Sequence, residues 1–387
     1  MARSLLPDPL QLIRSLVAIP SVSSANPDLD MSNRGVIDRL AHWLEPLGFA
    51  LEIVPLSHHP TKANLIATLG RGPGGLVLAG HTDTVPWDDG LWSYDPLGGV
   101  EADGRLYGLG TTDMKSFLAL AVHAASQVCA EDLKEPLIIL ATADEEITMA
   151  GARALVAHGQ PRARYAIIGE PTNMRPVRMH KGIFATSVAL HGRAGHSSNP
   201  ALGLNALEGM HHVIAELLQW RTALQRDHTH AAFEVPVPTL NLGRIQGGDN
   251  PNRICGHCHL HLDVRPLPGM DHEALKRQLH ARVEAAAHRW DARLDVDIAS
   301  LFDGIPAFET PATSELVRVV EALTGHSAEA VGFGTEAPFL TQLGMDVVVL
   351  GPGNMALAHQ PDEYLSLNQI NPTLELLNRA ITQFCLS

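Results

Sequence analysis

The sequence predicts an α/β protein with a mixed, largely parallel sheet, interrupted by an inserted α+β domain. Short apolar runs rich in Val, Ile and Leu lack alternation, as strands buried on both faces do. They occupy residues 76–80, 136–143, 165–169, 328–334 and 346–353. Stretches of helical period separate these runs. The middle of the chain instead alternates between apolar and polar residues, which is typical of a sheet with one open face.

Four helices are expected around the predicted buried strands. Residues 33–47 place their apolar side chains on one stripe, and Gly48 follows as a stop signal. Residues 115–128 and 150–158 have the same period. A last helix is expected over 371–384, with Pro372 at its first position.

The alternating middle of the chain predicts a separate domain. Residues 183–191 and 253–265 read as strands, and helices are expected over about 200–225 and 271–289. The order strand, helix, strand, strand, helix, strand is the split βαβ arrangement. We therefore expect residues 183–301 to be inserted into an α/β domain formed by residues 1–182 and 302–387.

Length and composition limit the classes of function. A chain of 387 residues exceeds the usual size of one core, which favours two domains. A net charge of −14 without a basic cluster argues against nucleic acid or an anionic membrane as partner. No apolar stretch approaches about 18 residues, so no membrane span is expected. Four cysteines do not suggest a disulfide framework, which fits a cytoplasmic protein.

Acidic and imidazole side chains follow the predicted buried strands. A lone histidine or a lone Glu-Glu pair at such a place is usually structural or solvated. Here several converge at the carboxyl ends of parallel strands, where open α/β sheets bind ligands. Without a cation, massed carboxylates would raise one another's pKa values, whereas an N/O ligand set suits zinc. The residues are His81, Asp83, Asp113, Glu145, Glu146, Glu170 and His359.

The motifs that contain these residues resemble the di-zinc aminoacylase and carboxypeptidase superfamily, in the same order and over essentially the whole chain. They are HTDTVP at 81–86, GLGTTDMK at 108–115, DEE at 144–146, GEPT at 169–172 and AHQPDEY at 358–364. The resemblance implies a zinc-peptidase-like catalytic domain and a ferredoxin-like dimerisation and lid domain at 183–301. It also implies two Zn²⁺ ions per subunit, which Co²⁺ can replace.

The resemblance also assigns the metal ligands. Asp113 is expected to bridge the two ions, and Ser116, where glycine is usual, is a departure that should not affect them. The remaining ligands are expected to be His81 and Glu170 on one ion, and Glu146 and His359 on the other.

Three further residues are expected to act in catalysis. The family uses the equivalent of Glu145 as a general base, which takes a proton from water and delivers it to the leaving nitrogen. Asp83 is expected to accept the second ring N–H of His81 and fix its tautomer. His196, in GRAGHSS, matches a histidine that stabilises the oxyanion from the partner subunit of a homodimer. Without the resemblance, His196 would be interpreted as a surface-loop histidine.

Substrate-binding residues are expected at three positions. The family places an asparagine and an arginine at Asn252 and Arg265, and the arginine can hold a carboxylate bidentately. The alternative for Arg265 is a salt bridge at a strand edge. Glu336 is a candidate for binding a substrate ammonium group.

Several local stretches resemble the subgroup that hydrolyses N2-acetyl-L-ornithine to L-ornithine and acetate in arginine biosynthesis. Leu109 stands where most relatives have arginine, and Glu336-Ala337 stands where desuccinylases have a serine-aspartate pair. The alternatives are a broader N-acyl-amino-acid deacylase, or a dipeptidase or carboxypeptidase of the same superfamily. A metal-binding protein without catalysis would need neither Glu145 nor His196.

The segment Cys255-Gly256-His257-Cys258-His259 is similar both to a thioredoxin-type CxxC and to a haem attachment site. However, alternation from 254 to 265 predicts a strand, which would put the two cysteines on opposite faces. We therefore expect no shared metal, haem or disulfide. The histidines 257, 259 and 261 share a face, and adventitious metal binding is the alternative there.

Overall fold

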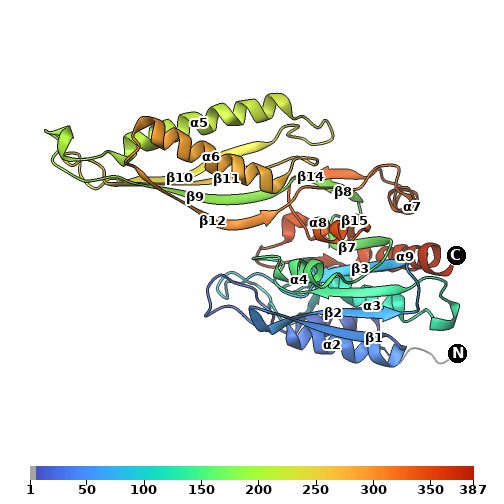
Figure 1. Ribbon diagram of the computed structural model, residues 1–387. Coiled ribbons are helices and arrows are strands. Elements are labelled where there is room, and N and C mark those ends of the chain that lie inside the picture. Colours follow the sequence, from blue (N-terminus) through green and yellow to red (C-terminus); the bar gives the residue numbers. More distant parts are fainter. Residues whose placement is uncertain (1–5) are drawn as a thin grey trace. The chain divides into compact units, whose positions relative to one another are not determined.

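The structure is a computed structural model that describes residues 6–387, so the first five residues of the predicted catalytic domain lie outside it. The chain forms two compact units (Figure 1). The first contains the described residues up to Arg178, with Thr310–Glu329 and Thr335–Ser387. The second contains Met179–Glu309 and Ala330–Gly334. Within residues 6–387, no helix is long and apolar enough to cross a membrane.

A mixed sheet forms the centre of the first unit. Its inner strands are parallel and lie in the order β6-β3-β7-β15, and the antiparallel hairpin β1-β2 continues the sheet beyond β6. The strands are β1 (Ala50–Leu56), β2 (His59–Leu69), β3 (Leu76–His81), β6 (Leu137–Thr142), β7 (Tyr165–Pro171) and β15 (Asp346–Gly351). The predicted mixed, largely parallel α/β sheet is therefore confirmed.

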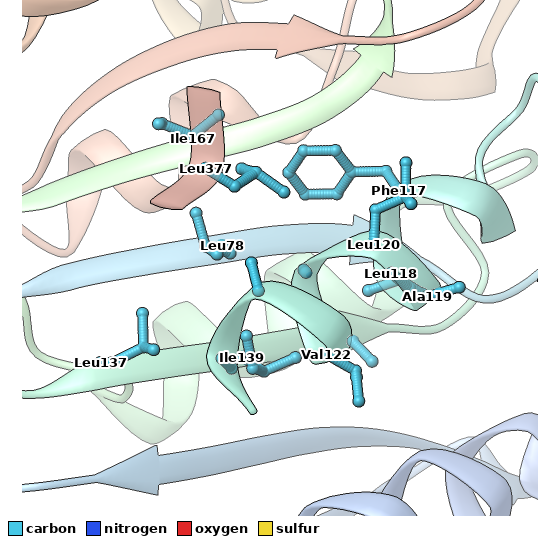
Figure 2. Packing of buried hydrophobic residues seen from close by; sticks show 14 of the residues in the cluster. Leu78, Phe117, Leu118, Ala119, Leu120, Val122, Leu137, Ile139, Ile167 and Leu377 are labelled. Atoms are coloured by element: carbon cyan, nitrogen blue, oxygen red, sulfur yellow. The ribbon is translucent and has the colours of Figure 1, made fainter. Parts of the chain in front are cut away.

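Helices cover both faces of this sheet. Figure 2 shows Phe117 and Leu118 of α3, with Leu377 of α9, packed against Leu78 of β3 and Ile167 of β7. Helices α4 and α8 contact each other, and α8 contacts β15. The helices are α1 (Pro9–Val17), α2 (Arg34–Leu44), α3 (Lys115–Ala125), α4 (Ala150–His158), α7 (Glu315–Thr324), α8 (Ala337–Gln342) and α9 (Ile370–Ile381).

Close packing between α3 and β7 places a glycine just before a site residue. A Cβ atom built on Gly169 would lie 1.8 Å from a ring carbon of Phe117. Only a residue without a side chain lets the strand pass the helix so closely. Gly169 thereby allows β7 to carry Glu170 past the end of α3.

A second, small sheet of the first unit supports the loop before α3. Its strands are β4 (Val100–Ala102), β5 (Arg105–Tyr107) and β16 (Tyr364–Ser366). The N–H of Gly108, at the start of that loop, donates to the carbonyl oxygen of Glu363 at 3.0 Å. Segments more than 250 positions apart in the sequence are thus held together.

The second unit is an antiparallel sheet in the order β10-β11-β9-β12, with α5 and α6 on one face (Figure 1). Both helices begin at side-chain caps, Asn205 and Asp271. The elements are β9 (Ile183–His191), α5 (Ala206–Asp227), β10 (Thr239–Gly247), β11 (His257–Arg265), α6 (His272–Trp290) and β12 (Asp295–Ile305). The short strands β8 (Val177–His180), β13 (Phe308–Glu309) and β14 (Glu329–Val331) stand at the points in the sequence where the chain passes from one unit to the other.

Some expected elements differ from those found. The run 328–334 was expected to be a buried strand, which is wrong: β14 has three residues, and it is partly exposed because it pairs with β8 outside the main path of the sheet. Helix α9 begins at Ile370, so Pro372 is its third residue; proline is tolerated there because first-turn N–H groups have no helical partner. Helix α5 begins at Ala206, after its Asn205 cap, and not near 200.

Candidate active site

Three neighbouring parallel strands bring the predicted polar residues to one edge of the sheet. His81 is the last residue of β3, and Glu170 lies near the end of β7. The turn with Glu145 and Glu146 follows β6, and Asp113 immediately precedes Met114, the N-cap of α3. Because parallel strands end at the same edge, these side chains converge.

Four side chains form a continuous contact chain at this edge. Nε2 of His81 lies 2.9 Å from Oδ1 of Asp113. Nε2 of His359 lies 3.4 Å from Oδ2 of Asp113 and 3.0 Å from Oε2 of Glu146. His81, Asp113 and Glu146 each offer one ligand atom within 4.8 Å of the others, an arrangement that suits a metal ion.

The electrostatics of the cluster suit a bound cation. Burial and the Asp113 carboxylate raise the pKa of Glu170 well above its usual range. Burial and the Glu170 carboxylate likewise raise the pKa of Glu145 well above its usual range. Oε1 of Glu170 is buried and has no hydrogen-bond partner among the described residues. An orphaned buried oxygen in a cluster of carboxylates fits divalent cations.

The two histidines of the cluster are each in contact with carboxylate groups. Burial lowers the pKa of His81, but Asp113, Glu170 and Glu145 outweigh this effect and place that pKa well above its ordinary value. Hydrogen bonds to Asp113 and Glu146 raise the pKa of His359 to about 10. Both imidazoles thus contact carboxylates, and imidazole with carboxylate is a ligand combination that binds divalent cations.

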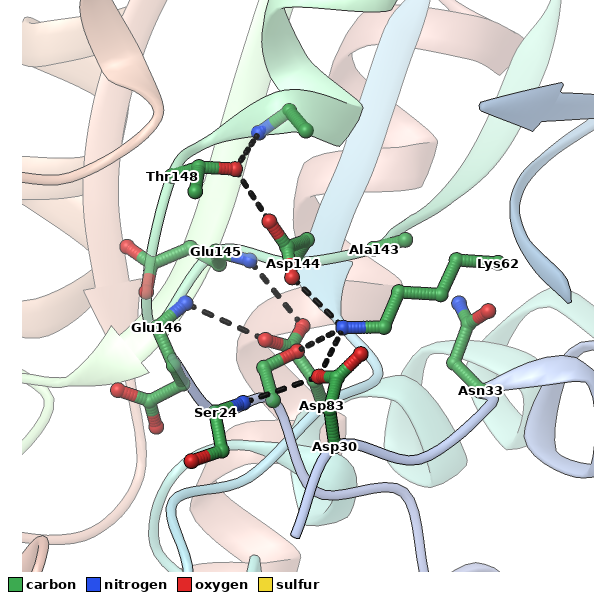
Figure 3. Close-up of polar contacts among 12 residues, drawn as sticks. Ser24, Asp30, Asn33, Lys62, Asp83, Ala143, Asp144, Glu145, Glu146 and Thr148 are labelled. Carbon is green, nitrogen blue, oxygen red and sulfur yellow. Dashed lines mark hydrogen bonds and ion pairs between the residues drawn. The ribbon is translucent and has the colours of Figure 1, made fainter. Parts of the chain in front are cut away.

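The orientation of His81 is fixed by Asp83, but not through the group expected. Nδ1 of His81 lies 3.0 Å from the main-chain oxygen of Asp83 and 3.8 Å from its carboxylate. An Nδ1–H donated to that carbonyl leaves Nε2 directed at Asp113, as a metal ligand requires. The carboxylate of Asp83 instead accepts the main-chain N–H groups of Glu145 at 3.3 Å and Glu146 at 3.2 Å (Figure 3).

Glu363 supports the site, although no role was predicted for it beyond its place in the AHQPDEY motif. Its side chain is buried and Oε1 accepts the N–H groups of Thr112 at 2.7 Å and Asp113 at 3.0 Å. Burial, together with the Asp113 carboxylate, raises the pKa of Glu363 to about 8. Glu363 thus fixes the main chain that carries Asp113.

Glu336 is buried beside the same cluster. Its side chain is 1% exposed, and Oε2 accepts a hydrogen bond from Oγ1 of Thr142 at 2.9 Å. Thr142 is the direct neighbour of His81 in the sheet. Burial raises the pKa of Glu336 to about 7, and its Oε1 has no hydrogen-bond partner among residues 6–387.

The other predicted residues lie in the second unit. His196 is exposed on the loop between β9 and α5, where Nδ1 contacts Oγ of Ser198 at 2.8 Å. Asn252 is exposed, and its main-chain carbonyl oxygen accepts the N–H of Ser197 at 3.0 Å. Nε of Arg265 donates to Oδ1 of Asp263 at 3.0 Å, so the alternative salt bridge at this position exists.

The expected separation of Cys255 and Cys258 is wrong. Strand β11 begins at His257, so the alternation does not reach back to Cys255. Both cysteines are buried in the same apolar cluster beneath α5 and α6, and both are free thiols. Burial raises the pKa of the Cys258 thiol to about 11, which disfavours its reactive thiolate form.

With this fold and site in view, the family of the chain follows from comparison with known proteins. Residues 77–383 match the model of peptidase family M20/M25/M40, and the chain belongs to this family of metal-dependent hydrolases. Two curated relatives of nearly full length are named acetylornithine deacetylase. The one from Pasteurella multocida (strain Pm70) is 48% identical, with 98% of this chain and 99% of that protein covered. The one from Photorhabdus laumondii subsp. laumondii is 46% identical, with 99% and 98% covered.

A solved structure shows the same fold at low identity. An M20 family metallo-carboxypeptidase from Sulfolobus solfataricus, Sso-CP2, superposes with a TM-score of 0.75 at 16% identity, with 97% of this chain and 99% of that chain covered. The resemblance found in the sequence motifs, to the superfamily and to its acetylornithine-hydrolysing subgroup, is therefore confirmed.

Proposed function

We propose that this chain hydrolyses the amide bond of N2-acetyl-L-ornithine and releases L-ornithine and acetate. The observation that carries the proposal is the identity of 48% and 46%, over nearly the full length, to two acetylornithine deacetylases. The same chain brings His81, Asp113, Glu146 and His359 into contact at the carboxyl ends of the parallel strands. The matched regions cover 98% and 99% of this chain.

In this proposal, the cluster would hold two zinc ions. Asp113 would be a ligand of both, because its two carboxylate oxygens face different histidines. Bound zinc, or Co²⁺ in its place, would supply an activated water and polarisation of the scissile carbonyl. The ligands proposed for the two ions are His81 and Glu170 on one side, and Glu146 and His359 on the other.

Glu145 is the proposed general base. It directly precedes the proposed ligand Glu146, and burial together with the Glu170 carboxylate raises its pKa above the ordinary value, which makes its carboxylate form a stronger base. Glu145 takes the proton of the attacking water and passes it to the leaving amide nitrogen. The Asp83 carboxylate holds the main chain of this turn at two N–H groups, which aims the Glu145 side chain.

One further role falls to the second unit. We propose that residues 183–301 form the lid and dimerisation domain of a homodimer, and that His196 donates to the oxyanion in the partner subunit's site. The support is the exposed position of His196 on a loop, where a side chain is free to reach another chain. A preorganised donor at the developing oxyanion stabilises the transition state.

Substrate selection is assigned to Arg265, Asn252 and Glu336. The terminal nitrogens of Arg265 hold the substrate carboxylate, since its contact with Asp263 uses Nε. Glu336 is proposed for the side-chain ammonium because it is acidic and has an unpartnered carboxylate oxygen among the described residues.

The four free thiols support a cytoplasmic setting.

A substrate panel tests the proposal. Purified protein with added zinc is assayed for amine release from N-acetylornithine, N-acetylvaline and a dipeptide, with chelator-treated protein as the control. We expect kcat/KM to be highest for N-acetylornithine, by at least about tenfold. Equal rates on N-acetylvaline would indicate a broader N-acyl-amino-acid deacylase, and preference for the dipeptide would indicate a peptidase; either result overturns the substrate assignment.

A further inference from the structure

Lys62 of β2 is a fully enclosed cation near the candidate active site. Its side chain is 2% exposed, and Nζ lies 2.7 Å from Oδ1 of Asp144, 2.6 Å from Oδ1 of Asp30 and 3.1 Å from Oγ of Ser23 (Figure 3). A buried ammonium group is costly unless it is paired and fully hydrogen-bonded. Two carboxylates and a hydroxyl oxygen compensate the burial of this ammonium group, and the two carboxylates raise the pKa of Lys62 despite its burial.

The Asp144 contact reaches the turn that carries the proposed base and a proposed metal ligand. Asp144 directly precedes Glu145 and Glu146, and it has a φ of +61°, which non-glycine residues adopt only when their surroundings hold them there. Its carboxylate also accepts the hydroxyl of Thr148. The turn is thus held at its start by Lys62 and along its main chain by Asp83.

The Asp30 contact reaches a second segment of the site. Residues 21–30 pack against the turn that follows β3: Oγ of Ser21 donates to the carbonyl oxygen of Thr82 at 2.7 Å, and the N–H of Ser23 donates to that of Thr84 at 2.9 Å. Asp30 also accepts the N–H of Ser24 at 3.0 Å. One ammonium group therefore ties the segment beside His81 to the turn beside Glu145.

We propose that Lys62 is a positioning residue: through Asp144 it sets the direction of the turn that aims Glu145 and Glu146. The inference rests on the proposed function, because it concerns the base and ligand of that reaction. The contacts of Nζ go to Asp144, Asp30 and Ser23, none of which is a proposed metal ligand or base. Its effect is geometric, and a misplacement of about 1 Å at reacting groups can cost on the order of 100-fold in rate.

The test compares three variants and one double variant in the full-length protein with zinc. Lys62→Met removes the charge and keeps the apolar stem, whereas Asp144→Asn and Asp30→Asn each neutralise one partner. We expect Lys62→Met and Asp144→Asn to lower kcat by about 10- to 100-fold with KM changed less than about threefold. We expect Asp30→Asn to stay within about threefold of wild type. The double variant of Lys62 and Asp144 should be no worse than the poorer single variant, because both break one link.

Lys276→Met is the matched control, since Lys276 pairs with Glu273 on α6, outside the site, and should leave kcat unchanged. A folded Lys62→Met protein with wild-type kcat would overturn the inference. So would an Asp30→Asn variant as impaired as Asp144→Asn, because Lys62 would then serve the N-terminal segment. If Lys62→Met does not fold, the two partner variants decide the question between these outcomes.

A readout without substrate separates this inference from the proposed function. Calorimetric zinc titration of the same variants should show one of two ions bound more weakly in Lys62→Met and Asp144→Asn, because Glu146 is misdirected. Wild-type protein that binds zinc but does not hydrolyse N-acetylornithine would reject the substrate while leaving this readout intact. If the wild-type protein hydrolyses N-acetylornithine but both variants bind zinc with unchanged affinity, the positioning role alone is rejected.

Discussion

Nε2 of His359 lies 3.4 Å from Oδ2 of Asp113, on the opposite carboxylate oxygen from the one that His81 approaches at 2.9 Å. A carboxylate with a histidine at each oxygen can serve two metal ions at once. The buried position of Asp113 and the hydrogen bond from its main-chain N–H to Glu363 fix this geometry before any ion binds.

The first prediction separates the bridging residue from a terminal one. Asp113→Ala should lower the zinc content from about two ions per chain to well below one, because both ions lose a shared ligand. His359→Ala should leave about one ion tightly held. Elemental analysis after dialysis provides the measurement. Two tightly held ions in the Asp113 variant would contradict the bridging role.

The second prediction concerns the substrate carboxylate. Arg265→Lys should raise KM for N-acetylornithine by about tenfold or more, because lysine keeps the charge but cannot form the bidentate contact. Steady-state kinetics on N-acetylornithine and on its carboxamide test this. If the variant and wild type lose equally on the carboxamide, the salt bridge with Asp263 is the main role of Arg265.

The third prediction tests whether the site is shared between subunits. Homodimers of His196→Ala and of Glu145→Ala should each lose at least about 100-fold in kcat. A mixed dimer carries both lesions in one site and none in the other, so it should recover up to about half of wild-type activity. Recovery is measured after subunit exchange, with the mixed dimer isolated by two tags. An isolated mixed dimer without activity would exclude action of His196 in trans.

The fourth prediction concerns the metal-free protein. Burial raises the pKa of Glu336 to about 7 and that of Glu363 to about 8, from ordinary values of 4.5. An acid with a raised folded pKa stabilises the fold fully below its unfolded pKa, and that contribution is lost as the pH rises through the folded pKa. The free energy of unfolding of chelator-treated protein should therefore fall between about pH 5 and pH 8.

Thermal unfolding at several pH values measures this fall. Metal-free Glu336→Gln is the control and should show a smaller fall, because one of the carboxyl groups with a raised pKa is gone. Zinc beside the carboxylates favours their ionised forms, so the Tm increase on adding zinc should be larger at pH 8 than at pH 5.5. An increase that does not depend on pH would contradict the described electrostatics.

The extent to which the sequence predicts this protein differs between fold and site. Uninterrupted apolar runs such as 76–80 and 165–169 identify buried parallel strands, and polar residues at their ends must then converge. The hairpin of β1 and β2 was not predicted, because its half-buried strands have neither a continuous apolar run nor strict alternation. Residues 254–256 continue the alternating pattern of β11 without belonging to the strand, so the pattern wrongly predicted that Cys255 and Cys258 lie on opposite faces.

Supporting residues were harder to predict than ligands. Lys62 in a strand is ordinarily a solvated side chain, and only tertiary packing places it between Asp30 and Asp144. The carboxylate of Asp83 was expected beside His81, yet the main-chain carbonyl of the same residue occupies that place. Such choices between side chain and main chain depend on the path of a turn, which residue type does not specify.

In the proposed reaction, bound zinc and Glu145 are both required to hydrolyse N-acetylornithine. Zinc titration of metal-free wild type and of Glu145→Gln, followed in parallel by calorimetry and by ornithine release, tests both requirements. We expect about two ions to be bound by each protein, with turnover rising on zinc addition in wild type and staying about 10²–10⁴-fold lower in Glu145→Gln. A variant with full zinc content and more than a tenth of wild-type kcat would contradict the role of Glu145 as the base.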